Sequence, residues 1–340
     1  LTPDFDPDLA VDVDGTVWFD TLWLGCSSAA SSRDGGKTWT TSPLACVPPA
    51  GDRQYLIPTK GGTAYIYAHS LPTFYQMVAK TTDHGATWTP LGSAEGVGHH
   101  LLLTGGSGWG GGGFWNPATD SVFLTYTWFE GDAWSPAASV TRDGGRTWEV
   151  VKAETMGGDG VGLSLVVGAA DHAGNVYLAW AESHADGKDM AVYLASSADD
   201  GRTWSKPKRV DDGTGSKVFP SIAALAPGKV AVAYYEADEA AYPARVAKTT
   251  GWNVTLAWTA DALADAPAWE RATLSDGTAR HGPICPDGTS CQGNRQLLDY
   301  FALKATPDGR VASVWTSTDD VEGRTLNVFA ATERALLASG

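Results

Sequence analysis

The sequence predicts an all-β fold built from repeated four-stranded sheets, and three observations carry this prediction. A short turn pattern containing Asp, Gly and Trp recurs along the chain, and apolar segments rich in Val, Tyr and Trp recur in step with it. Glycine contributes 40 and proline 18 of the 340 residues. This density of turn residues excludes a helical bundle, and collagen is excluded because the glycines follow no Gly-X-Y period.

The turn pattern reads Ser/Thr-x-Asp-x-Gly-x-Thr-Trp and occurs four times. Asp accepts hydrogen bonds from backbone amides, Gly adopts a positive φ angle, and the Trp ring packs beneath the turn. We therefore predict a hairpin turn with a structural role for its aspartates, in preference to a role as metal ligands. A fifth, stretched copy is expected from Thr259 to Trp269. The four regular aspartates are Asp34, Asp83, Asp143 and Asp199.

Six apolar segments run in step with these turns, each following a Gly or Asp turn, as buried strands do. Each repeat is therefore predicted to consist of four strands, joined in order by a tight turn, a loop and an Asp turn. Radial repetition of four-stranded sheets is a β-propeller, so residues 1–340 are predicted to form one six-bladed propeller domain. The sixth unit lacks sequence for a fourth strand, and residues 1–5 are expected to supply it. The six segments begin at Gly15, Gly62, Asp120, Gly174, Gly228 and Gly309.

Charge and hydropathy exclude several partners. The chain carries 24 basic and 39 acidic residues, and its formal net charge is −15. Nucleic acid and anionic membrane surfaces would be repelled at long range, and no apolar run is long enough to span a bilayer. Because the sequence begins at Leu1 without Met, removal of an upstream segment is expected, and we predict a secreted or cell-surface monomer.

The four cysteines predict two disulfides, because their spacing suits pairing in an oxidising compartment. Cys26 and Cys46 lie symmetrically about a hairpin centred on Gly36, and Cys285 and Cys291 close a short loop. The alternative is four reduced thiols. A zinc site is not predicted, since neither CxxC nor paired-His spacing occurs.

The Asp turns, the GxVYLAW-type strands and two further segments, 52–58 and 294–303, resemble bacterial sialidase-like proteins of the BNR or Asp-box repeat family. The resemblance covers nearly the whole chain. It implies a propeller that acts on or recognises glycans. Sialidases of this family hold a substrate carboxylate with three arginines, and they use a tyrosine nucleophile, a glutamate and an acid/base aspartate. The stretch corresponding to the first of those arginines, residues 1–10, contains no arginine here.

Candidate site residues follow from the predicted topology. The Asp turns should share one face of the propeller, so the starts of the first strands and the ends of the second strands should share the opposite mouth, where a concave ligand site is expected. We predict Tyr235 as nucleophile, Glu236 as its base and Asp52 as general acid, with Asp20 and Asp299 as alternatives for the acid. Strand alternation allows only one of Tyr234 and Tyr235 to reach the mouth. The predicted substrate-binding residues are Arg53, His99, Trp128, Glu182, Arg295, Asp299 and Tyr300.

Three functions remain open from the sequence. The first is an exo-acting, sialidase-like glycosidase on an acidic glycan, in which Arg53 and Arg295 hold a carboxylate. The second is a uronate lyase, in which His99 or His100 with a tyrosine abstracts a proton. The third is a glycan- or protein-binding propeller without chemistry.

No cofactor is required by any of these readings. Asp4, Asp6 and Asp8 alternate at the start of the first strand and are the oxygen donors that Ca²⁺ would take, while the alternative is solvated carboxylates in an acidic protein.

Overall fold

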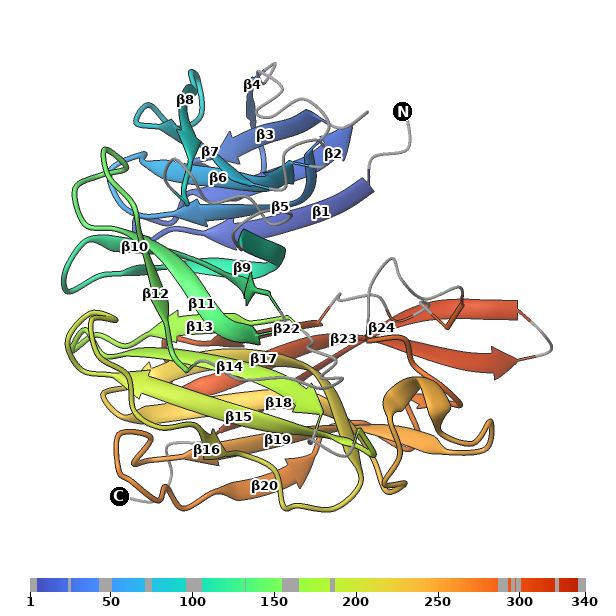
Figure 1. The fold of residues 1–340 in the computed structure, drawn as a ribbon. Helices are drawn as coiled ribbons and strands as arrows, with labels where there is room; N and C mark the ends of the chain where they lie inside the picture. The colour runs from blue at the N-terminus through green and yellow to red at the C-terminus, as the bar shows by residue number, and fades with distance from the viewer. Residues whose placement is uncertain are drawn as a thin grey trace. The chain divides into compact units, whose positions relative to one another are not determined.

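The computed structural model describes residues 5–23, 26–42, 51–70, 75–95, 106–131, 133–154, 165–183, 187–286, 293–294, 297, 301–321 and 324–335. The chain divides into two compact units, Leu1–Met156 and Gly157–Gly340, and each is considered by itself. Within the described residues every regular element is a β-strand except the 3-10 helix η1, Pro243–Arg245 (Figure 1).

The first unit holds three antiparallel sheets of four strands, each ordered as its strands follow in the chain. The first sheet comprises β1 (Phe5–Val11), β2 (Val17–Trp23), β3 (Cys26–Ser32) and β4 (Thr40–Ser42). The second comprises β5 (Gly51–Pro58), β6 (Ala64–Ser70), β7 (Gln76–Thr81) and β8 (Thr89–Ser93). The third comprises β9 (Gly106–Asn116), β10 (Ser121–Glu130), β11 (Ala133–Thr141) and β12 (Glu149–Lys152).

The second unit holds one four-stranded sheet and one larger sheet. The four-stranded sheet comprises β13 (Val167–Ala170), β14 (Val176–Ser183), β15 (Met190–Ser197) and β16 (Lys208–Arg209). In the larger sheet, β17 (Ser216–Ala226), β18 (Lys229–Ala237), β19 (Gly251–Thr259) and β20 (Glu270–Thr273) repeat the four-stranded pattern. The short β21 (Arg280–His281) joins β19 to a last group, β22 (Phe301–Ala305), β23 (Arg310–Val321) and β24 (Arg324–Ala335).

The predicted four-stranded antiparallel units are therefore present, and the last group has the three strands expected of it. The predicted source of a fourth strand is wrong for Phe5, which begins β1 and pairs with Leu22 of β2. Residues 1–4 lie outside the described part of the chain. The blade count of six, the closure of a ring and the single domain stay predictions.

The repeated Asp turn connects the third and fourth strands of a sheet through one set of hydrogen bonds. In the third copy, Oδ1 of Asp143 accepts hydrogen bonds from the amides of Arg146 and Thr147, and Oδ2 accepts one from the Thr147 hydroxyl at 2.7 Å. The hydroxyl of Thr141 donates to Oδ1 of the same aspartate and accepts from the Gly145 amide. The same hydroxyl-to-carboxylate hydrogen bonds recur around Asp34, Asp83 and Asp199, with serine in place of the first threonine at Asp34 and Asp199.

These hydrogen bonds make folding sensitive to acid. The hydrogen bonds donated by the threonine four residues on lower the pKa of Asp34, Asp83 and Asp143 from the ordinary 3.8 to about 2. A carboxyl group with a lowered folded-state pKa stabilises the fold above its unfolded pKa, and this contribution is lost as the pH falls through the folded value. We expect the thermal unfolding midpoint to fall between pH 4 and pH 2, and to fall less in the Asp143→Asn variant. An identical pH dependence in both proteins, measured by circular dichroism, would contradict this account.

Neighbouring sheets within each unit are joined by side chains that reach from one sheet to the Asp turn of the next. The Ser31 hydroxyl donates to the His84 carbonyl at 2.6 Å, and the Lys80 ammonium donates to the Gly144 carbonyl at 2.9 Å. In the second unit the Lys208 ammonium donates to the Ala262 carbonyl at 3.0 Å. The turns therefore also anchor the packing of successive sheets.

Three of the strands that begin a sheet or repeat carry a bulge at the end far from the Asp turns. Asp6 in β1, Arg53 in β5 and Phe219 in β17 have φ angles of 51°, 52° and 53°, and the strand pairing shifts at each of them. A non-glycine residue in this left-handed region is strained, by roughly 1–3 kcal/mol. Because bulges redirect side chains at the ends of sheets, this position is where a functional side chain can leave the regular alternation.

Candidate functional site

In the first unit, Arg53 lies at the centre of a group of polar side chains. Its amide donates to the Asp52 carboxylate at 2.9 Å, which holds the bulge, and its guanidinium donates to the Tyr55 hydroxyl at 3.4 Å. Arg53, Asp52 and Tyr55 are all half-buried, so each presents some surface to solvent. Two predicted site residues, Asp52 and Arg53, are therefore joined by a hydrogen bond in the bulge of β5, and their roles stay predictions.

Two stacked tyrosines support this arginine. The rings of Tyr55 and Tyr67 are stacked, with centroids 5.3 Å apart and an interplanar angle of 28°. The Tyr55 hydroxyl donates to the Gly110 carbonyl at 3.0 Å. A Cβ atom on Gly110 would lie 2.9 Å from the Tyr67 hydroxyl, so the close approach of β9 requires glycine here. Burial raises the pKa of Tyr55, although the positive charge of Arg53 opposes the shift. Both phenols are therefore neutral hydrogen-bonding groups at physiological pH.

Two carboxyl groups lie on β1 and β2, the strand pair next to β5. The Asp8 carboxylate accepts hydrogen bonds from the amides of Leu9 and Leu56 at 2.8 and 2.9 Å. Asp8 lies opposite Asp20 on β2, and Asp20 is fully buried. Burial and the nearby Asp8 charge raise the pKa of Asp20 well above its ordinary value. The raised pKa favours the protonated form of Asp20, which lies opposite the hydrogen-bonded Asp8, as in paired-acid sites.

His69 of β6 is the last member of the polar group around Arg53. His69 pairs across the sheet with Asp52, and its Nδ1 lies 3.0 Å from the amide nitrogen of Gln76. Burial, with a further contribution from the charge of Arg53, lowers the pKa of His69 from 6.5 to about 4. The imidazole is therefore neutral near pH 7.

Tyr235, the predicted nucleophile, lies instead in the core of the second unit. It is 1% exposed, its hydroxyl donates to the Thr316 carbonyl at 2.7 Å, and its ring contacts Phe219 and Phe301. Burial raises its pKa above the ordinary value for tyrosine, which opposes formation of a phenolate. This environment is that of a packed, hydrogen-bonded core residue.

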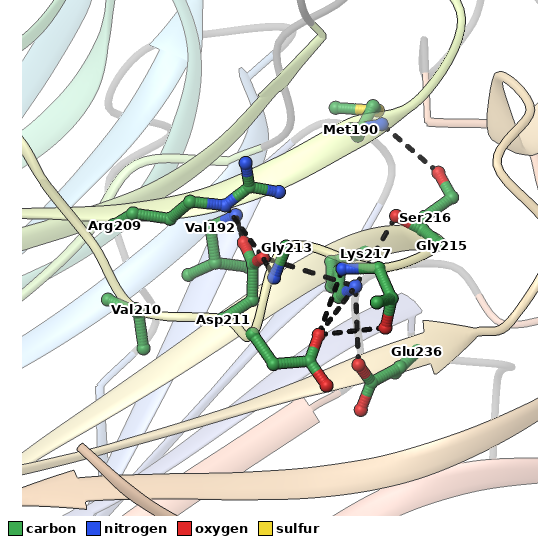
Figure 2. Close-up of polar contacts among 12 residues, drawn as sticks. Met190, Val192, Arg209, Val210, Asp211, Gly213, Gly215, Ser216, Lys217 and Glu236 are labelled. Carbon is green, nitrogen blue, oxygen red and sulfur yellow. Dashed lines mark hydrogen bonds and ion pairs between the residues drawn. The ribbon is translucent and has the colours of Figure 1, made fainter.

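Glu236 does not act as a base for Tyr235 in this arrangement, because the two side chains lie on opposite faces of β18. Figure 2 shows Glu236 beside Lys217, whose ammonium lies 3.2 Å from the Glu236 carboxylate. The Thr255 hydroxyl donates to the other oxygen of this carboxylate. Lys217 is also within 4.0 Å of Asp211 and 3.6 Å of Asp212. Glu236 thus belongs to an ion-pair network, and the predicted pair is separated.

The remaining predicted residues fall into two sets. Trp128 is buried, with the Lys152 ammonium 5.2 Å from its ring centroid, and Glu182 accepts a hydrogen bond from the Trp180 indole at 2.6 Å. Both lie on second strands, where the predicted topology put them. Four predicted site residues lie outside the described part of the chain, namely His99, Arg295, Asp299 and Tyr300.

The cysteines are described only in part. Cys26 and Cys285 are disulfide-bonded and carry no free thiol. Their predicted partners, Cys46 and Cys291, lie outside the described residues, so the pairing stays a prediction.

The candidate calcium ligands are likewise described only in part. Asp4 is outside the described residues, Asp6 occupies the bulge of β1, and Asp8 makes the amide contacts given above. Among the described residues no group of three or more His, Cys, Asp and Glu side chains is arranged to hold a metal ion. The same residues contain no helix that is long and apolar enough to cross a bilayer.

Sequence reasoning missed two parts of this group. Tyr55 and Tyr67 look like ordinary strand residues, and only their stacking against the glycines of β9 shows that they support Arg53. Asp8 was considered as a metal donor, whereas its register with Asp20 makes it one of a carboxyl pair. The pairing of Asp8 with Asp20 could have been predicted, because the two aspartates lie in strands that are joined by one tight turn.

No protein-family model matches the chain, and no curated protein shows significant similarity to it. Solved structures do match. The intramolecular trans-sialidase from Ruminococcus gnavus, in complex with oseltamivir carboxylate, is 12% identical, with 98% of this chain and 94% of that chain covered and a TM-score of 0.57. A protein of unknown function from Dyadobacter fermentans is 15% identical over 97% and 94% of the two chains, with a TM-score of 0.57.

A third match is the GH93 α-L-arabinofuranosidase of Fusarium graminearum in complex with arabinobiose. It is 13% identical, covers 83% of this chain and 80% of that chain, and has a TM-score of 0.53. At these identities the likeness concerns the fold. In fold, the chain is therefore similar to the sialidase-like β-propeller glycosidases, which confirms the resemblance noted in its repeats.

Proposed function

We propose that the chain is a secreted, monomeric glycoside hydrolase that acts on a glycan bearing a carboxylate, with its active site around Arg53 in the first unit. The observation that carries the proposal is the placement of Arg53 on a strained bulge, with Asp52 bonded to its amide and Tyr55 bonded to its guanidinium. The likeness in fold to sialidases and an arabinofuranosidase supports a glycan as the substrate. The disulfide-bonded state of Cys26 and Cys285 supports a location outside the cytoplasm.

Arg53 supplies substrate binding in this proposal. A guanidinium presents two parallel N–H donors that match the two oxygens of a sugar carboxylate. Tyr55 supports Arg53 only through its ring and hydroxyl: it stacks on Tyr67, accepts the hydrogen bond from the guanidinium, and lies close to Gly110 of β9. An arginine that is fixed before the substrate arrives loses less side-chain entropy on binding.

The carboxyl groups supply the proton transfers. Asp52 protonates the glycosidic oxygen as the bond between that oxygen and the anomeric carbon breaks, and Asp8 accepts a proton from the water that attacks the anomeric carbon. Most glycosidases use two carboxyl groups in these roles. The water oxygen forms the new bond, so the products are a free sugar and a free hydroxyl on the leaving group.

Hydrolysis of fluorogenic glycosides tests the proposal. We expect the purified chain to release fluorophore from a methylumbelliferyl sialoside or glucuronide faster than from the matching neutral glucoside. Asp52→Asn should lower kcat by roughly 10²–10⁴-fold, as loss of general acid catalysis does. An exposed aspartate of the fifth turn, Asp265→Asn, is the control and should leave kcat unchanged. Absence of turnover on all the substrates, or an unchanged kcat in Asp52→Asn, would contradict the proposal.

A uronate lyase is the second candidate, and the neutral imidazole of His69 near Arg53 favours it. A lyase would abstract the proton beside the uronate carboxylate, with the arginine neutralising the charge that develops there. His99, the residue first predicted for this role, lies outside the described residues. Ultraviolet absorbance of an unsaturated uronate product would identify the lyase, because elimination forms a carbon–carbon double bond and hydrolysis does not.

A further inference from the structure

A cavity of about 270 Å³ lies in the second unit, where the stretched fifth turn replaces the regular Asp turn. Its walls come from the ends of β17, β19 and the starts of β18 and β20, so it belongs to the end of the sheet that carries the turns. The group containing Tyr235 and Phe219 lies toward the other end of the same strands. The functional residues of its wall are Lys229, Trp258, Asp261, Trp269 and Glu270.

The stretched turn differs from the other four copies at one carboxylate oxygen. In the regular copies Oδ2 of the aspartate accepts a hydrogen bond from a threonine hydroxyl, as Asp143 does from Thr147. Asp261 keeps the bond from the Thr259 hydroxyl, and the Ala268 amide donates to the same oxygen, Oδ1. Position 265 holds Asp in place of that threonine. Within the described residues Oδ2 of Asp261 accepts no hydrogen bond, so a ligand hydroxyl can take the place of the threonine.

Two more charged groups of the wall are available to a ligand. The Lys229 ammonium and the Glu270 carboxylate make no hydrogen bond or ion pair with the side chains of the described residues. Together with Asp261 they provide one cation and two carboxylates, a net negative wall in a chain of formal charge −15. Such a wall disfavours an anionic ligand and offers acceptors and donors for hydroxyl groups.

Two half-buried indoles complete the wall. Trp269 packs partly against the aromatic core of the unit, and Trp258 packs against a second cluster around Leu256. Their rings are held by the core while part of each faces the cavity. Aromatic rings offer a flat apolar surface, and the C–H face of a sugar ring is a suitable partner for it. The volume is near the lower end of the ~300–1,000 Å³ range of small-molecule sites, which suits a sugar unit.

We propose that this cavity is a carbohydrate-binding site for a neutral sugar residue, separate from the site around Arg53. The ring stacks on Trp258 and Trp269, and its hydroxyls donate to Asp261 and Glu270 and accept from Lys229. A glycan carries many sugar units, so a second binding site raises the effective concentration of the polymer at the protein. The inference does not depend on the proposed hydrolase activity.

Saturation-transfer NMR and calorimetry on the full chain test this site, with lactose and arabinobiose as neutral probes and glucuronate as the anionic probe. We expect saturable binding of a neutral probe with a Kd of about 1 mM. Glucuronate is measured on the Arg53→Met variant, which lacks the proposed carboxylate site, and should bind this variant more weakly or not at all. Trp258→Ala should weaken neutral-sugar binding by about tenfold. Glu270→Gln changes an exposed side chain and Lys229→Met a half-buried one, and each should weaken the binding severalfold.

Two controls separate this site from the proposed active site. Trp39→Ala removes an indole of a regular turn that is 42% exposed, and it should bind neutral sugars as the wild type does. Arg53→Met should also leave this binding unchanged. The proposal is overturned if neither neutral probe binds saturably, or if Trp258→Ala and Glu270→Gln both bind as tightly as the wild type.

Discussion

Arg53→Met is expected to lower kcat/KM on a carboxylate-bearing glycoside by about 100-fold, mainly through KM. The substitution removes the charge-assisted hydrogen bonds to the substrate carboxylate, and such bonds contribute about 1.5–3 kcal/mol each. Methionine retains the apolar part of the side chain but loses the hydrogen bond to the Tyr55 hydroxyl. The bulge of β5 should persist, because the Asp52 carboxylate accepts its hydrogen bond from the backbone amide of residue 53. Steady-state kinetics on the substrate that the wild type prefers measure the effect.

Two matched variants make this result specific. Arg53→Lys keeps the charge but loses the paired donors, so we expect a value between the wild type and Arg53→Met. Arg33→Met removes an exposed arginine of the first Asp turn and should leave kcat/KM unchanged. Kinetics of Arg53→Met within twofold of the wild type would remove Arg53 from the site.

Lys217→Met is expected to destabilise the protein by about 3 kcal/mol, the lower end of the cost of breaking a buried ion pair. The ammonium is fully buried, lies 3.2 Å from Glu236, and donates to the Gly215 carbonyl at 3.3 Å. Asp211 is also fully buried, but Arg209 stays 2.8 Å from it in the variant, which limits the loss. Urea unfolding followed by fluorescence gives the change in free energy.

Arg310→Met provides the comparison, because Arg310 forms an ion pair of 2.7 Å with Asp308 on the surface of the same unit. Exposed pairs contribute about 0–1 kcal/mol, so this variant should unfold close to the wild type. Equal destabilisation by the two substitutions would show that burial of Lys217 does not decide its contribution.

The repeated turns were the most predictable part of this chain. Their residue types are set by local chemistry, since Asp, Gly and Thr at fixed spacing satisfy the amides of one turn, and Asp143 makes those bonds as the pattern requires. The strands before and after the turns followed from apolar segments of regular spacing. Residues 106–116 form β9 although this segment is rich in glycine, which is uncommon in strands. There glycine serves close packing on Tyr67 and Ile57 rather than a turn.

The candidate site was harder to predict because it depends on register and on bulges. No glycine marks the left-handed residues Arg53 and Phe219, so no residue type indicates that the alternation of side chains breaks there. The pairing of Glu236 with Lys217 depends on the register between β17 and β18, which spacing alone does not fix. Alternation did predict that Tyr234 and Tyr235 face opposite sides, but not that Tyr235 would be enclosed by Phe219 and Phe301.

The crystal structure of the chain with a non-hydrolysable sugar carboxylate tests the central claim most directly. We predict that the carboxylate of the sugar accepts hydrogen bonds from the guanidinium of Arg53, with the Asp52 carboxyl group beside the glycosidic oxygen. A carboxylate bound to other arginines, with Arg53 still directed at Tyr55 and away from the ligand, would contradict the account.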